Sequence, residues 1–140
     1  MKTIICIWGN AGVGKTSVIK RVFDKLNISA LAPVEEPGDD IYAILDYRNR
    51  KVGIASMGDP GSGQDEYLRR MVEDEECEII VCASRTKGWT VECVDMYAQK
   101  HGYQLVWFSP FAGYGQINRN LLNDLSSDAI MHLICHLSNI

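Results

Sequence analysis

Short apolar runs at five places in the chain predict five β-strands. The runs TIICIW (3–8), EIIVCAS (78–84) and YQLVWFS (103–109) have the length and the apolar content of strands that are buried on both faces of a sheet. The stretches IYAILDYRN (41–49) and KVGIASMGD (51–59) also resemble strands, and only a tight polar link joins them. A parallel return needs a crossover of about a dozen residues, so these two strands are predicted to form an antiparallel hairpin.

Apolar residues recur at helical spacing between the predicted strands. This pattern predicts helices over 14–26, 65–75, 90–101 and 116–138, and Gly102 follows the third of them as a C-terminal cap. The resulting order of elements is β-α-β-β-α-β-α-β-α. Strands that alternate with helices predict a three-layer α/β fold, with a mostly parallel sheet and helices on both of its faces.

The composition is that of one globular domain, and we expect residues 1–140 to form it without a linker or repeat. Of the residues, 46% are hydrophobic and 23% are charged, which is typical of soluble proteins. No apolar run approaches the roughly 18 residues that a membrane span needs, and the N-terminal run is too short for a secretion signal. The five cysteines form no C-x-x-C pair, which favours reduced thiols and a cytoplasmic location. The net charge of −4 argues against general nucleic-acid binding.

The stretch GNAGVGKT follows the first predicted strand and opens the first predicted helix, and it matches G-x-x-x-x-G-K-[ST]. Glycines let the backbone curl so that successive N–H groups face an anion, and the helix N-terminus adds a positive dipole. Lys15 would reach the β- and γ-phosphates of a nucleotide, and the Thr16 hydroxyl would bind Mg²⁺. The expected phosphate-binding residues are Gly9, Asn10, Ala11, Gly12, Val13, Gly14, Lys15, Thr16 and Ser17.

On these residues the chain resembles the P-loop NTPase superfamily, and the hairpin after the first helix is similar to that of the small GTPases. The resemblance implies a five-stranded sheet of order 2-3-1-4-5, in which strand 41–49 is an antiparallel edge strand. It also implies a carboxylate at the end of the strand beside the P-loop, and Asp59 supplies one that would hold Mg²⁺ through a water. Gln64 lies near the place where GTPases keep a water-orienting glutamine. The alternatives are a β-turn aspartate for Asp59 and a solvated helix-start residue for Gln64.

The chain departs from the GTPase pattern at the base-recognition motif and in the first switch-like loop. The nearest register to N-K-x-D is Thr86-Lys87-Gly88-Trp89, in which Lys87 fits and would pack along the base, whereas Trp89 replaces the carboxylate that reads guanine. ATP and GTP therefore both remain candidate ligands. Residues 28–40 contain no threonine to close over the metal, and Ser29 is their only hydroxyl.

Two further features have two interpretations each, and a third suggests a partner. Arg85, just after strand 78–84, would contact a phosphate or a second substrate, or else is a surface arginine. The acidic stretch VEEPGDD (34–40) is interpreted as solvated loop charge, with a metal or cationic partner as the alternative. The loops 28–40 and 59–64 resemble switches and would contact a protein partner.

The sequence thus predicts Mg²⁺-dependent binding and hydrolysis of a nucleoside triphosphate, ATP or GTP. Lys15, Asp59 and Gln64 would serve the reaction, Thr16 and Asp59 would hold the metal, and backbone amides would stabilise the γ-phosphate. One alternative is a small kinase that transfers the γ-phosphate to a nucleotide or metabolite. A second alternative is an interaction module that nucleotide occupancy switches without turnover.

Overall fold

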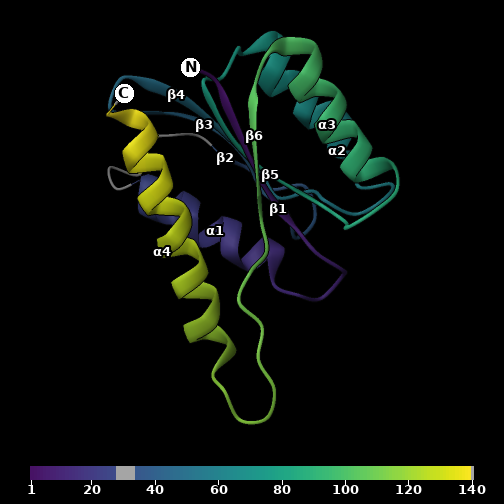
Figure 1. The fold of residues 1–140 in the computed structure, drawn as a ribbon, viewed down its shortest axis with the longest axis vertical. Helices are drawn as coiled ribbons and strands as arrows, with labels where there is room; N and C mark the ends of the chain where they lie inside the picture. The colour runs from purple at the N-terminus through teal and green to yellow at the C-terminus, as the bar shows by residue number, and fades with distance from the viewer. Residues whose placement is uncertain (28–33, 140) are drawn as a thin grey trace.

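A computed structural model of the chain describes residues 1–27 and 34–139, and Figure 1 shows its fold. The elements in chain order are β1 (Thr3–Trp8), α1 (Lys15–Leu26), β2 (Val34–Glu35), β3 (Tyr42–Tyr47), β4 (Arg50–Ala55), α2 (Gln64–Arg69), the π-helical turn η1 (Arg70–Asp74), β5 (Ile79–Ser84), α3 (Trp89–His101), β6 (Gln104–Phe108) and α4 (Arg119–Ser138). The four α-helices of this described part lie close to the predicted ranges. In the same part, no helix has both the length and the apolar character that crossing a bilayer would take.

The sheet is mixed and has the strand order β2-β3-β4-β5-β1-β6. The four strands from β4 to β6 run parallel, whereas β3 pairs antiparallel with both β2 and β4. The predicted hairpin is confirmed: Tyr47 lies opposite Arg50, and the two residues between them have positive φ angles of 51° and 65°. Positive φ at both positions is the twist that a two-residue hairpin turn needs.

The expected five-stranded sheet of order 2-3-1-4-5 is wrong in two respects. The structure adds a sixth strand, β2, whose two residues cover β3, so β3 is not an edge strand. The expected order also puts β1 between β4 and β5, whereas β1 lies between β5 and β6, and the register of β1 with β5 pairs Ile4 with Ile80 and Cys6 with Cys82. Both β4 and β5 are apolar and largely buried. Their local sequence patterns therefore do not determine the order of these strands relative to β1.

Two helical layers cover the two faces of the sheet (Figure 1). On one face, the apolar stripes of α1 and α4 pack on alternate strand residues such as Ile5, Ile54 and Val81. On the other face, α2, η1 and α3 pack on the intervening residues, such as Cys6 and Ile80. This alternation is the period-two pattern of a strand that is buried on both sides.

The end of α4 that approaches α1 is fixed by polar contacts. The side chain of Asn118 caps α4 by accepting a hydrogen bond from the Leu121 N–H at 3.1 Å, so the helix begins at Arg119 rather than at the predicted 116. The ammonium of Lys25 on α1 bonds to Asp124 at 2.8 Å and to Asp128 at 2.7 Å. These bonds raise the pKa of Lys25 despite the opposing effect of burial. The N-terminal end of α4 is thereby held beside α1.

Gly58→Ala tests the close approach of the chain after β4 to the end of β5. A Cβ at Gly58 would lie 2.7 Å from the Ala83 Cβ and 2.9 Å from its carbonyl carbon. Backbone cannot move aside cheaply, so the variant should lose about 1–3 kcal/mol of unfolding free energy, measured in urea. Gly53→Ala is the matched control, because its Cβ would meet side-chain atoms alone, the Met71 Sδ at 2.8 Å and the Cys77 Sγ at 2.9 Å, and should cost less. Equal losses in the two variants would contradict this packing.

Candidate functional site

The loop between β1 and α1 forms an open cradle of backbone groups. Gly12 and Gly14 have φ angles of 81° and 93°, a conformation that L side chains rarely adopt. Gly14 precedes α1, and no side chain in the described part of the chain caps this helix N-terminus. A Cβ at Gly14 would lie 2.7 Å from the Asn123 side chain. The first-turn N–H groups are therefore available to an anion, and glycine keeps the cradle open.

Lys15 lies beneath this loop with its ammonium buried. Only 7% of the residue is exposed, and its Nζ donates hydrogen bonds to the carbonyl of Gly9 at 2.7 Å and to that of Ser84 at 3.1 Å. Burial lowers the pKa of Lys15, whereas the nearby carboxylate of Asp59 opposes that shift. The result is a poorly hydrated cation whose charge another anion would stabilise.

Asp59 lies between two cations at one side of the loop. Its Oδ1 is 2.7 Å from the Arg85 Nε and 3.6 Å from the Lys15 Nζ. The hydrogen bond from Arg85 is the main reason that the pKa of Asp59 is lowered. Arg85 follows β5, and because β5 lies next to β4, this arginine pairs with Asp59, which follows β4.

A second carboxylate, which the sequence interpretation treated as solvated loop charge, lies against Thr16. The Thr16 hydroxyl donates to the Asp40 Oδ1 at 3.3 Å, and the Ser56 hydroxyl donates to the same oxygen at 2.8 Å. Ser56 is fixed in turn by two hydrogen bonds with the backbone of Ile41. A signal for Asp40 existed in the sequence: it directly precedes one strand of the predicted hairpin, so it lies at the same sheet edge as the end of the other strand.

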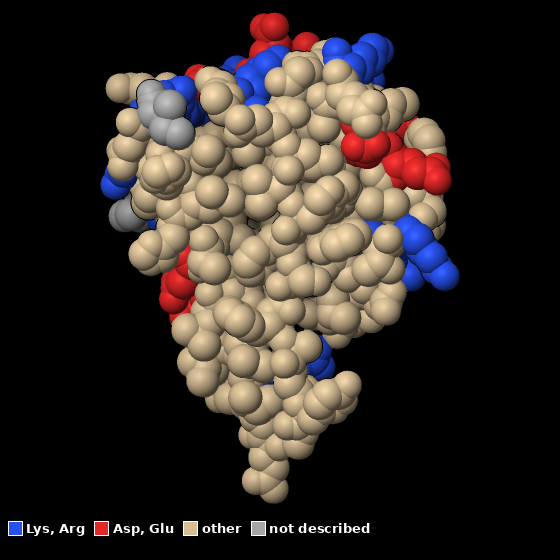
Figure 2. Space-filling view, viewed as in Figure 1, with Lys and Arg blue, Asp and Glu red and all other residues tan. Residues whose placement is uncertain are grey.

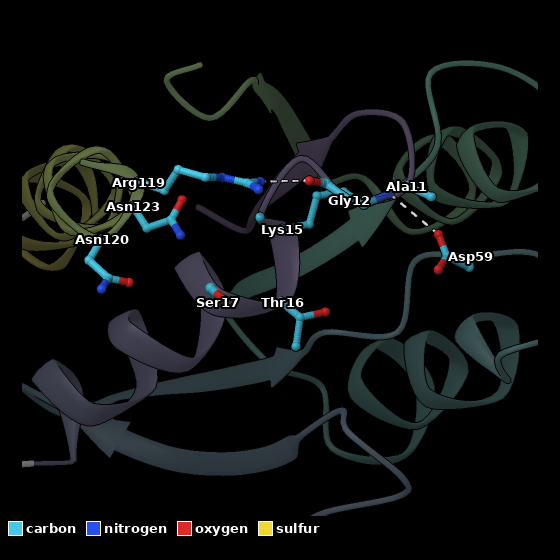
Figure 3. A pocket seen from close by; sticks show the side chains of 10 residues that line it. Ala11, Gly12, Lys15, Thr16, Ser17, Asp59, Arg119, Asn120 and Asn123 are labelled. Carbon is cyan, nitrogen blue, oxygen red and sulfur yellow. Dashed lines mark hydrogen bonds and ion pairs between the residues drawn. The ribbon is translucent and has the colours of Figure 1, made fainter. Parts of the chain in front are cut away.

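The N-terminal turns of α4 form the wall opposite Asp59, as Figure 3 shows. The Arg119 guanidinium donates to the carbonyl of Gly12 at 2.8 Å, and Asn120 and Asn123 face the start of α1. Sequence analysis missed these three residues, which lie about a hundred positions from the loop and match no motif. The cavity between the walls has a volume of about 480 Å³ and is lined by Ala11, Gly12, Gly14, Lys15, Thr16, Ser17, Asp59, Arg119, Asn120 and Asn123.

Several predicted site residues do not line this cavity. Gln64 is buried at the start of α2, where its amide nitrogen donates to the carbonyls of Ala83 and Thr90, both at 2.9 Å. Its amide oxygen is buried and has no hydrogen-bond partner among the described residues. Lys87 is exposed beyond the lining. Ser29 and residues 28–33 lie outside the described residues.

The other loop residues that the motif implies differ in their positions relative to the cavity. The carbonyl of Gly9 faces inward, where it accepts the bond from Lys15. The residue Asn10 is exposed and does not belong to the lining. Val13 lines a neighbouring cavity of about 170 Å³, which also contacts Phe111 and Arg119. The curled backbone thus presents only part of the motif to the main cavity.

The oxygen atoms of the site fit a magnesium ion better than a softer metal. Nowhere in residues 1–27 and 34–139 do three His, Cys, Asp or Glu side chains gather as a metal site. The hydroxyl of Thr16 and the carboxylate of Asp40 are instead separated by 3.3 Å. An octahedral ion with ligands at about 2.0–2.1 Å places adjacent ligands about 3 Å apart, and it keeps several positions for water and phosphate. Thr16 and Asp40 could therefore supply two ligands to a hard cation such as Mg²⁺, and water and phosphate would fill its other positions.

Comparisons of the chain with protein-family models, with curated proteins and with solved structures give no match. The chemistry of the site follows from its own geometry. A buried ammonium, an uncapped helix N-terminus, one arginine and one carboxylate line the cavity, and Arg85 and Asp40 bond to its lining residues Asp59 and Thr16. Such a combination can hold a polyanion together with a divalent cation.

Gln64→Ala tests whether this side chain supports the fold. Its loss would remove one donor from each of two buried carbonyl groups, those of Ala83 and Thr90, so the unfolding free energy should fall by about 1–3 kcal/mol. The matched control is Gln99→Ala on α3, where the exposed amide bonds only to Asp95 one turn earlier. Urea unfolding of both variants measures the effect. Unchanged stability in Gln64→Ala, combined with slower turnover of nucleotide, would instead support a role in ordering water.

Proposed function

We propose that this chain binds a Mg²⁺–nucleoside triphosphate in the 480 Å³ cavity and hydrolyses it. The observation that carries the proposal is the buried ammonium of Lys15, held by two carbonyl groups below the uncapped N-terminus of α1. Burying a cation is costly unless an anion or several acceptors compensate for the lost water. A triphosphate supplies such an anion at the point where the loop N–H groups converge.

Binding would exchange one anion for another at Lys15. Asp59 now lies 3.6 Å from this ammonium, and its other cation, Arg85, lies closer at 2.7 Å. When the γ-phosphate takes its place beside Lys15, Asp59 keeps the partner with the shorter contact. Neither charge is then left unpaired, which keeps the electrostatic cost of binding low.

The metal would be held by Thr16 and Asp40, with Asp59 acting through a water. Ser56 supports this arrangement because its hydroxyl fixes the Asp40 oxygen at 2.8 Å. Mg²⁺ in this position would neutralise charge on the β- and γ-phosphate oxygens. The sequence alone suggested a metal held by Thr16 and Asp59. In the present proposal Asp40, not Asp59, is the carboxylate that binds the metal directly.

The nucleoside end of the ligand would lie along α4. Ser17 and Asn120 line that part of the cavity, and Arg119 lies 2.8 Å from the carbonyl of Gly12, within reach of a phosphate. Asparagine amides both donate and accept hydrogen bonds, so they can contact either purine. ATP and GTP are both substrates in this proposal. This proposal gives no role to Lys87, which was expected to pack along the base but does not line the cavity.

Hydrolysis transfers the γ-phosphoryl group to water. The water oxygen bonds to the γ-phosphorus while the bond from that phosphorus to the bridging oxygen breaks, and the bridging oxygen leaves with the electron pair. The proton of the water ends on the inorganic phosphate. Lys15 and the backbone amides of the loop would compensate the charge on the phosphate oxygens, which is where catalysis of this reaction mainly acts. A measurement of released inorganic phosphate distinguishes hydrolysis from transfer to an acceptor and from binding without turnover. The loop 59–64, which the structure describes, remains the proposed contact for a protein partner.

Lys15→Met tests the proposal directly. The methionine keeps the apolar stem and removes the charge, so affinity for ATP and GTP should fall at least about 100-fold, which is about 2.7 kcal/mol. Calorimetric titration measures the affinity, and thermal unfolding checks that the variant is folded. Lys20→Met, one turn later on α1, is the matched control and should bind as the parent does. Parent-like affinity in Lys15→Met would refute the proposed site.

The carboxylate variants Asp40→Asn and Asp59→Asn separate the two metal assignments. Asp40→Asn should reduce the gain in affinity that Mg²⁺ provides by about tenfold or more, because it removes a charge from the metal site. Asp39→Asn, exposed and adjacent, is the control and should keep that gain. Asp59→Asn should raise the Mg²⁺-free affinity, since it removes the anion that competes for Lys15. A larger loss of the Mg²⁺ effect in Asp59→Asn than in Asp40→Asn would favour the assignment made from the sequence.

A further inference from the structure

Charged residues are distributed unevenly along the chain. The first 100 residues contain 29 Asp, Glu, Lys and Arg residues, whereas residues 101–140 contain three, and the segment 103–118 contains none. Two of the three, Asp124 and Asp128, pair with Lys25 on α1. The third, Arg119, lines the nucleotide cavity. Consequently β6, the loop after it and the outward side of α4 carry almost no charge.

These elements form one face of the molecule. Figure 2 shows this face in the orientation of Figure 1, with β6 in front, the loop below it and α4 beside it. Its centre is uncharged, and the acidic and basic side chains lie mainly at its margins. We call it the β6–α4 face. A soluble protein with 23% charged residues has no need for such a surface unless something covers it.

Large apolar side chains are exposed on the β6–α4 face. Their exposed fractions range from 44% to 101%, and they are Phe111, Tyr114, Ile117, Leu121 and Leu125. Together they expose on the order of 500 Å², if a large side chain exposes about 200 Å² in full. The largest patch on a typical monomer is about 300–600 Å², and each partner in a standard interface contributes about 800 Å². Adding the half-buried side chains of β6 brings the face to the size of an interface.

The strand β6 is an open edge of the sheet. It pairs with β1 alone, and on its outer side no hydrogen bond to another strand occurs within residues 1–27 and 34–139. Edge strands are usually protected by charged residues, proline or a bulge. The sequence QLVWF of β6 has none of these charges and no proline. Its free N–H and C=O groups match another extended strand.

We propose that the β6–α4 face joins two copies of this chain into a homodimer. The β6 strands of the two copies pair antiparallel about a two-fold axis, and the exposed side chains of the loops and of α4 cover each other. A second copy fits because an edge strand is complementary to itself in this arrangement. The net charge of −4 does not oppose the contact, since the acidic residues lie off the face. A partner recognised by opposite charge would find few ionic groups there.

Sedimentation of the whole chain over a range of concentrations tests the dimer. The parent should have twice the mass of the 15.7 kDa chain at micromolar concentration. Leu121→Lys places a charge on the exposed side of α4 and should weaken the dimer at least about 100-fold. The matched control is Met96→Lys, because Met96 is similarly exposed on α3 but lies off the face, and it should remain dimeric. A monomeric parent, or a Leu121→Lys variant as dimeric as the parent, would overturn the proposal.

Hydrogen exchange distinguishes strand pairing from contact through α4 alone. The outward amides of β6 should be protected at high concentration and exchange faster when the protein is diluted below the dissociation constant. The same amides should exchange fast at every concentration in Leu121→Lys. A dimer in which the β6 amides show no concentration-dependent protection would refute the pairing. Neither measurement uses nucleotide, so the outcome is independent of the proposed hydrolysis.

Discussion

The bonds from Lys15 to the carbonyls of Gly9 and Ser84 join the three parts on which the site depends. They connect the glycine-rich loop, the start of α1 and the end of β5, which are far apart in the sequence. An ammonium can do this because its three donors point in different directions and carry a charge. The same contacts keep the cation beneath the loop, where any anion that the loop N–H groups bind would also meet it.

The position of β5 decides which side chains surround this cation. With β5 between β4 and β1, the residues that follow two parallel strands converge on Lys15, and Asp59 and Arg85 meet as an ion pair. In the expected order, strand 3–8 would have separated the strands that precede Asp59 and Arg85, so the two side chains would have lain on opposite sides of the loop. The observed pair holds Asp59 3.6 Å from the Lys15 ammonium, where the proposed phosphate would take its place.

The opposite side of the cavity depends on the packing of α4 on α1. The Lys25 contacts with Asp124 and Asp128 hold α4 so that Arg119 reaches the loop carbonyl of Gly12. The outward side of the same helix belongs to the uncharged β6–α4 face. One helix thus contributes to a polar cavity on one side and to the proposed dimer interface on the other.

Local features of the sequence determined the elements, the hairpin and the loop. Apolar runs gave β1 and β5 to within about one residue, Gly102 ended α3 as expected with a φ of 73°, and Gly12 and Gly14 adopt positive φ angles between β1 and α1. These features depend on sterics and periodicity over a few residues, so a single sequence contains them. The strand order, the burial of Gln64 and the approach of Asp40, Arg85 and Arg119 were decided only by the tertiary structure. They depend on which of several similar apolar surfaces pack together, and that choice is made by the summed contacts of the whole chain.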